Sequence, residues 1–113
     1  MTICDRGDVV LVPFPFTDLS EVKRRPALVI STGEYNRATD DVVIAQITSR
    51  IQAPRRPGDH HVEKWREAGL LSSSLVRARL TTLQNGLLIR ILGRMPDEEM
   101  KLIDQALASA LGF

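Results

Sequence analysis

The sequence predicts a small, barrel-like β fold that is closed from the outside by one C-terminal helix. Several short apolar segments, rich in β-branched residues, are separated by turn-forming residues, which is typical of antiparallel sheets and small barrels. The last segment, 96–111, instead has apolar residues spaced by three and four, as in an amphipathic helix. A chain of 113 residues can bury one hydrophobic core, so residues 1–113 are expected to form a single domain.

Five segments have the composition of strands: 9–12, 27–30, 42–47, 74–80 and 87–93. Pro13 is expected to end regular pairing of the first strand, because proline lacks the backbone donor that a ladder uses. Residues 31–36 are expected to be a connector and residues 51–60 a mobile loop. Residues 63–69 suit a short helical turn that a glycine closes.

The C-terminal helix is expected to begin after Pro96, because proline is favoured in the first turn. Acidic residues at 97–99 follow, where the helix dipole favours negative charge. One face of this helix is apolar and consists of Met100, Ile103, Leu107, Ala110 and Leu111. This face is expected to pack against the sheet.

The charge of the chain is small in total but unevenly distributed. The formal net charge is +1, whereas residues 97–113 hold four acidic side chains and one basic side chain. The chain is therefore not a bulk polycation, and any contact with nucleic acid must use a local basic patch.

The cysteine and histidine content limits the chemistry that the chain can perform. Cys4 is the only cysteine, which excludes an internal disulfide and fits a reducing compartment. No apolar run approaches membrane-spanning length, so a cytoplasmic protein is expected. His60 and His61 are adjacent and point to opposite sides of an extended chain, so we expect neither a metal site nor a cofactor. A surface role is favoured for both, with general acid–base work by one of them left open.

The most unusual stretch is Lys23-Arg24-Arg25-Pro26, which runs directly into the apolar segment 27–30. Pro26 biases Arg25 toward extended geometry, which places this arginine at the mouth of a strand. Three adjacent cations repel one another, so an anionic partner is one interpretation. A solvated basic turn before a core strand is the other interpretation.

Two further groups of polar residues stand at strand positions. Thr48, Ser49 and Arg50 follow the third predicted strand and are suited either to bind a phosphate or to satisfy a turn. Arg77 and Arg79 share one face of the fourth predicted strand, because side chains alternate along a strand. That pair forms either an anion-binding feature or a solvated strand edge.

Taken together, these motifs resemble the MazF/PemK family of toxin endoribonucleases. The resemblance rests on the order of the segments 6–12, 25–30, 46–49 and 74–77, with the terminal helix after them. It implies an SH3-like β barrel with a C-terminal helix, a homodimer, and metal-independent cleavage of single-stranded RNA such as mRNA. It also implies a cognate antitoxin that wraps the toxin and blocks its RNA groove.

The resemblance assigns roles to individual residues. The family's catalytic arginine falls on Arg25 and its catalytic threonine on Thr48, with Ser49 at a frequent hydroxyl position. Two departures from the family pattern concern the loop 16–24, which lacks glycine, and Arg79, which stands where some PemK-type members have a catalytic aspartate. The residues expected to bind RNA are Lys23, Arg24, Ser49, Arg50, Arg77 and Arg79.

The implied reaction is attack of a ribose 2′-hydroxyl on the adjacent phosphorus, which gives a 2′,3′-cyclic phosphate and a 5′-hydroxyl. Arg25 suits stabilisation of charge on the phosphoryl oxygens, and Thr48 suits positioning of one of them. Arginine is a poor base, so Glu21 or a histidine is the candidate proton carrier. An antitoxin tail with acids and apolar anchors would complement the basic residues Lys23, Arg24, Arg77 and Arg79.

Two functions from other classes remain open. The first is a toxin like CcdB, which poisons gyrase on the same type of barrel and cuts no RNA. The second is a non-catalytic SH3-like module that binds protein or nucleic acid.

Overall fold

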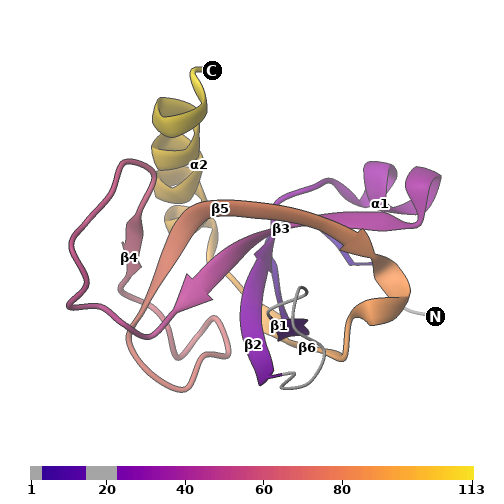
Figure 1. The fold of residues 1–113 in the computed structure, drawn as a ribbon, viewed down its shortest axis with the longest axis horizontal. Helices are drawn as coiled ribbons and strands as arrows, with labels where there is room; N and C mark the ends of the chain where they lie inside the picture. The colour runs from indigo at the N-terminus through magenta and orange to yellow at the C-terminus, as the bar shows by residue number, and fades with distance from the viewer. Residues whose placement is uncertain (1–3, 15–22) are drawn as a thin grey trace.

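A computed structural model describes residues 4–14 and 23–113 of the chain (Figure 1). In chain order the elements are β1 Asp8–Phe14, β2 Lys23–Val29, α1 Gly33–Thr39, β3 Asp41–Thr48, β4 His60–Val62, β5 Ser74–Gln84, the 3₁₀ turn η2 Asn85–Leu87, β6 Arg90–Arg94 and α2 Asp97–Leu111. The described strands form one sheet in the order β4-β5-β3-β2-β1-β6, and every neighbouring pair is antiparallel. The prediction of a mainly β fold with a C-terminal helix is confirmed.

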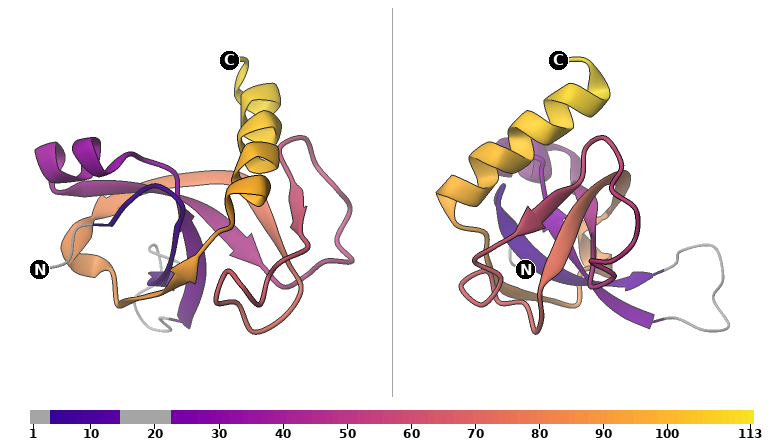
Figure 2. Two further views of the ribbon diagram at one scale, coloured as in Figure 1. Left: turned by 180° about the vertical axis from the view of Figure 1, so that it is seen from behind. Right: turned by 90° about the vertical axis from the view of Figure 1, so that its left-hand side faces the viewer.

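The sheet curls into an open half-barrel. The edge strands of the described sheet are β4 and β6, which each have one partner. The long strand β5 bends across the molecule, and α2 stands at the end where β4 lies (Figures 1 and 2). None of the described helices is long and apolar enough to cross a membrane.

Alternation along the strands divides the apolar residues between two clusters. Val9 packs in the first cluster and Val10 in the second, because successive side chains of a strand point to opposite faces. The buried face of α2 packs in the first cluster through Met100, Ile103 and Leu107. The second cluster is smaller and contains Cys4, Val10, Val12, Ala27, Val29, Val42, Ile44 and Leu83.

The first two strands begin or end further out than the sequence indicates, and the expectation that Pro13 ends pairing was wrong. Pro13 lies within β1 opposite Arg24, and β2 begins at Lys23 rather than after Pro26. The reason is positional: β6 pairs with β1 only as far as Leu11, so Pro13 has a single neighbouring strand. A proline is accommodated there because its missing N–H can lie on the unpaired side.

Other differences concern short elements and helix ends. The expected connector contains the helix α1, which Thr32 caps by accepting a hydrogen bond from the backbone N–H of Tyr35 at 3.1 Å. The expected loop 51–60 ends in the short strand β4. At the end of α2 the side chains of Ala110 and Leu111 are exposed, so the buried face stops at Leu107.

Candidate functional site

One face of the sheet changes from apolar to polar along β3. Val42 and Ile44 belong to the second apolar cluster, and Gln46 and Thr48 follow on the same face at the alternating positions. Gln46 and Thr48 line a cavity instead of the core. The polar end of this strand therefore opens onto solvent at the edge of the second cluster.

The neighbouring strand β2 makes the same change in the same direction. Val29 and Ala27 belong to the second cluster, and Arg25 is the next residue on that face, two positions before Ala27 in the chain. Ala27 pairs with Gln46, so continuing this register by two residues sets Arg25 opposite Thr48. Both residues line a cavity of about 340 Å³, here called the arginine cavity, whose lining is Arg25, Gln46, Thr48, Arg50, Ala53, Arg77 and Arg79.

A β-bulge in β5 supplies the other side of the arginine cavity. Ala45 pairs with Leu80 and Ile47 pairs with Val76, so the three residues 77–79 stand opposite Gln46 alone. Bulges of this kind re-aim side chains and occur often beside active sites. Arg77 and Arg79, which flank the middle residue of this bulge, both line the arginine cavity. This agrees with the prediction that they share one face of the strand.

The arginine cavity is strongly cationic. Four guanidinium groups line it, and no carboxylate or histidine does so among the residues that the structure describes. The side chains of Arg25, Arg50 and Arg79 make no hydrogen bond or ion pair with any described residue. Guanidinium groups bind phosphate oxygens with two parallel hydrogen bonds, so this arrangement suits a phosphodiester.

Thr48 has two roles in the structure. Its Oγ1 accepts a hydrogen bond from the backbone N–H of Arg50 at 3.2 Å, which closes the turn after β3. The side chain also lines the arginine cavity, and its hydroxyl hydrogen can still be donated. The two interpretations of Thr48, a turn residue and a phosphate ligand, are therefore compatible.

A second cavity, of about 530 Å³, lies beside the first and shares Arg25 with it. Arg24 and Ser49 line this adjoining cavity, together with apolar side chains that include Leu71 and Ile91. Lys23 is exposed on β2 and lines neither cavity. The residues expected to bind RNA are thus divided: Arg50, Arg77 and Arg79 lie in the arginine cavity, Arg24 and Ser49 in the adjoining one.

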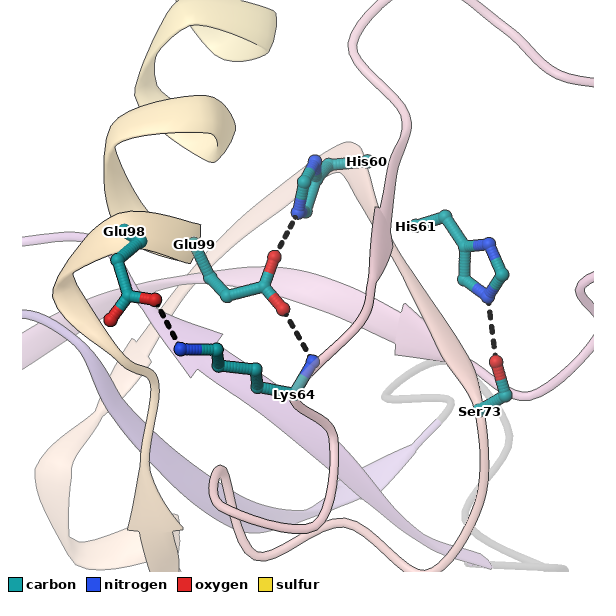
Figure 3. A network of polar contacts seen from close by, with 6 residues as sticks. All are labelled: His60, His61, Lys64, Ser73, Glu98 and Glu99. Atoms are coloured by element: carbon teal, nitrogen blue, oxygen red, sulfur yellow. Dashed lines mark hydrogen bonds and ion pairs between the residues drawn. The ribbon is translucent and has the colours of Figure 1, made fainter.

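The two histidines that are candidate proton carriers contact residues outside the arginine cavity. His60 Nε2 is 2.7 Å from Glu99 Oε1, and His61 Nε2 is 2.6 Å from Ser73 Oγ (Figure 3). Neither histidine lines the arginine cavity. Glu21, the other candidate, lies outside the described residues.

Glu99 connects α2 to β4 and to the turn after it. Its Oε2 accepts a hydrogen bond from the backbone N–H of Lys64 at 2.6 Å, and its Oε1 contacts His60 (Figure 3). Burial raises the pKa of Glu99, but the hydrogen bonds from Lys64 and His60 and the charge of His60 outweigh it, so the pKa is lowered overall. This network holds the segment that follows the 49–59 loop. Within the described residues, no three His, Cys, Asp or Glu side chains gather as a metal site.

A family model for the PemK-like, MazF-like toxins of type II toxin–antitoxin systems matches residues 5–111. The chain belongs to this family. It is 29% identical to the endoribonuclease MazF of Staphylococcus saprophyticus over 114 residues, which covers 96% of this chain and 91% of that protein.

Solved structures of MazF-like proteins share the fold. MazF of Deinococcus radiodurans matches with a TM-score of 0.77 and 28% identity over all of both chains. A mycobacterial endoribonuclease solved in complex with its cognate antitoxin matches with a TM-score of 0.78 and 25% identity, over 97% of this chain and 96% of that one. The expected family and its fold are therefore confirmed.

The structure of this MazF-like toxin also shows two residues that sequence reasoning missed at the site. Gln46 lines the arginine cavity and stands two positions before Thr48, so strand alternation alone could have indicated it. Asp59 contacts Arg77 from behind the cavity, and no local pattern indicates it, because it comes from an irregular loop.

Proposed function

We propose that this MazF-like toxin is a metal-independent endoribonuclease that cleaves single-stranded RNA, including mRNA, in the cytoplasm. The observation that carries the proposal is the arginine cavity, in which four guanidinium groups and Thr48 converge without a described carboxylate. Such a cavity favours a polyanion, and only RNA carries the 2′-hydroxyl that attacks without a metal ion. Family membership supports the same activity.

In the proposed reaction the 2′-oxygen forms a bond to the adjacent phosphorus while the bond from phosphorus to the 5′-oxygen breaks. The products are a 2′,3′-cyclic phosphate and a 5′-hydroxyl, so one proton leaves the 2′-oxygen and one reaches the 5′-oxygen. Arg25 stabilises the charge that develops on the phosphoryl oxygens, and the Thr48 hydroxyl donates to one of them. The two groups come from neighbouring strands, β2 and β3, whose ladder ends two residues away from them at Ala27 and Gln46.

Proton transfer has no obvious carrier in the described lining of the arginine cavity. Glu21 remains our candidate, since a carboxylate can exchange a proton with the 2′-hydroxyl whereas a guanidinium stays protonated and is a poor base. Arg25 is therefore assigned an electrostatic role, not that of a base.

We further propose that the toxin is a homodimer that a cognate antitoxin inhibits. The mycobacterial relative solved with its antitoxin supports such a partner. The adjoining cavity combines the cations Arg24 and Arg25 with apolar side chains, so a disordered tail with acids and apolar anchors would complement it. The exposed Lys23 would add to this attraction.

Incubation of the purified protein with single-stranded RNA in EDTA tests the proposed activity. We expect cleavage to fragments that end in a 2′,3′-cyclic phosphate, and no cleavage of the same oligonucleotide with a 2′-deoxy group at the scissile position. The deoxy oligonucleotide should still bind, and more weakly as the salt concentration rises. Intact RNA in EDTA would contradict the proposal. Gyrase poisoning without RNA cleavage would then favour a toxin like CcdB, and the absence of both activities would favour a binding module.

The substitution Thr48→Val is expected to lower kcat about tenfold, because it removes one hydrogen bond of roughly 1.4 kcal/mol to the transition state. Single-turnover cleavage in EDTA measures this effect. Thr48→Ser should retain most of the rate, since it keeps the hydroxyl. Thr82→Val, a matched change at an exposed position of β5, should leave kcat unchanged; equal losses in Thr48→Val and Thr82→Val would contradict a role for the Thr48 hydroxyl.

A further inference from the structure

We propose that Asp59 is a positioning residue for the cleavage reaction, which it serves by holding the guanidinium of Arg77 in the arginine cavity. This inference rests on the proposed endoribonuclease function. Asp59 Oδ2 is 3.3 Å from Arg77 Nη2, and Arg77 is the only one of the four cavity arginines that pairs with a described carboxylate. Asp59 itself does not line the arginine cavity.

Asp59 and Arg77 form a buried pair. The Asp59 side chain is 2% exposed and the Arg77 side chain 13% exposed. Burying a carboxylate costs free energy unless a cation and hydrogen bonds compensate it. This pair is therefore not an ordinary surface ion pair, and its burial calls for a functional explanation. The position of Arg77 at the cavity supplies that explanation.

The carboxylate is fixed by the backbone around it. Gly58 has a φ of +92°, and a Cβ added there would lie 2.6 Å from the Cβ of Ala78 and 3.0 Å from that of Ala110. The loop therefore passes tightly between β5 and α2 immediately before Asp59. The backbone N–H of Arg56 also donates to Asp59 Oδ2, at 2.9 Å.

The residue after Asp59 is held as firmly as the residue before it. His60 begins β4, pairs with Val76 of β5 and contacts Glu99 of α2. Val76 directly precedes Arg77, so the two ends of the Asp59–Arg77 contact are tied together by the ladder. The Asp59 carboxylate is therefore held in a fixed position, and its contact with Arg77 fixes the position of that guanidinium.

The contact orients Arg77 without occupying all of its donors. Its Nη2 contacts Asp59 and donates to the carbonyl of Pro54 at 3.3 Å. Its Nε and Asp59 Oδ1 are buried and have no hydrogen-bond partner among the described residues. No described residue accepts a hydrogen bond from Nη1, so both donors of this nitrogen remain for a phosphate oxygen.

A double-mutant cycle on single-turnover cleavage in EDTA tests this role. Asp59→Asn is expected to lower kcat about tenfold with a change in KM below about threefold, because small errors in placement act mainly on the transition state. In an Arg77→Met background, the further change Asp59→Asn should alter kcat by less than about twofold, since Asp59 acts through Arg77. Thermal unfolding is followed in parallel, and the double variant should have a higher Tm than Arg77→Met alone, which leaves a buried carboxylate unpaired.

Asp8→Asn is the matched control, because Asp8 also contacts an arginine, Arg94 at 3.2 Å, and neither residue lines the arginine cavity. It should leave kcat unchanged. Three outcomes would overturn the role of Asp59. They are an unchanged kcat in Asp59→Asn, an equal loss of kcat in the wild-type and Arg77→Met backgrounds, and values of kcat that rise and fall with Tm across the variants. If Asp59→Asn does not fold, Asp59→Glu replaces it: this variant keeps the charge but moves the carboxylate, so it should still lower kcat, and an unchanged kcat would overturn the role of Asp59. A wild-type protein that leaves RNA intact contradicts the proposed function itself, and the role of Asp59 with it.

Discussion

Arg25→Ala is expected to lower kcat for RNA cleavage by about 10² to 10³, the loss seen when one donor to a developing oxyanion is removed. Arg25 lines both the arginine cavity and the adjoining one, and no described side chain competes for its donors. Its guanidinium can therefore meet a phosphoryl oxygen without first breaking a pair with any residue that the structure describes. Single-turnover cleavage of a single-stranded RNA in EDTA measures the loss.

Two further variants make the Arg25 result specific. Arg25→Lys keeps the charge but loses the planar fork, so it should recover only a small part of the lost rate. Arg66→Ala removes an arginine that stacks on Trp65, 4.8 Å from the ring centroid, and lines neither cavity, so it should leave kcat unchanged. Near-full cleavage by Arg25→Lys would contradict the bidentate role.

Glu99→Ala is expected to reduce the free energy of unfolding by about 3 kcal/mol, because breaking a buried pair leaves its partners without compensation. Glu99 is a buried residue of α2, and its loss removes the oxygens that contact His60 and accept from the Lys64 N–H. Urea denaturation at pH 7 measures the change. The contact that holds His60, the residue directly after the 49–59 loop, should be lost at the same time.

The neighbouring residue provides a matched control. Glu98 forms an ion pair with the Lys64 side chain at the surface, so Glu98→Ala should change the free energy of unfolding by less than about 1 kcal/mol. Equal effects at positions 98 and 99 would show that burial is not the cause.

The Glu99 network should also make stability depend on pH at the acidic end. The pKa of Glu99 is lowered from its ordinary value of 4.5, so the unfolded chain takes up this proton at a higher pH than the folded protein does. The stabilisation is therefore complete above about pH 4.5 and is lost as pH falls through the folded-state pKa. Glu99→Gln, which cannot titrate, should flatten this acid limb in denaturation curves from pH 7 to pH 3; a parallel shift at all pH values would contradict the assignment.

The sequence predicted the longer helix and strands of this fold because each of them has the composition or the apolar spacing of its element over most of its length. The β-branched, apolar composition of 42–47 and the helical spacing in 96–107 both correspond to buried residues. The three-residue strand β4 has no pattern of its own and exists because β5 lies beside it. The helix α1 was missed although Thr32, its N-cap residue, carries the expected local signal.

The site was predictable only where it depends on strand position. Arg25 and Thr48 line one cavity because β2 and β3 are paired neighbours, and Arg77 and Arg79 line it from one face of β5. The bulge that places residues 77–79 opposite one residue of β3 depends on the register between strands that are far apart in sequence. The same is true of Asp59, whose partner Arg77 is distant along the chain.

The crowding of four guanidinium groups in a cavity of about 340 Å³ has a cost for the empty protein. Like charges that line one cavity repel one another, and among the described residues only Arg77 of these four has a counter-ion. A bound polyanion would relieve this repulsion. Neutralising Arg25, Arg50 or Arg79, which pair with no described carboxylate, should therefore raise the free energy of unfolding of the unliganded protein while it lowers the rate of RNA cleavage. At the arginine cavity, the stability of the unliganded protein and its nuclease activity therefore oppose each other.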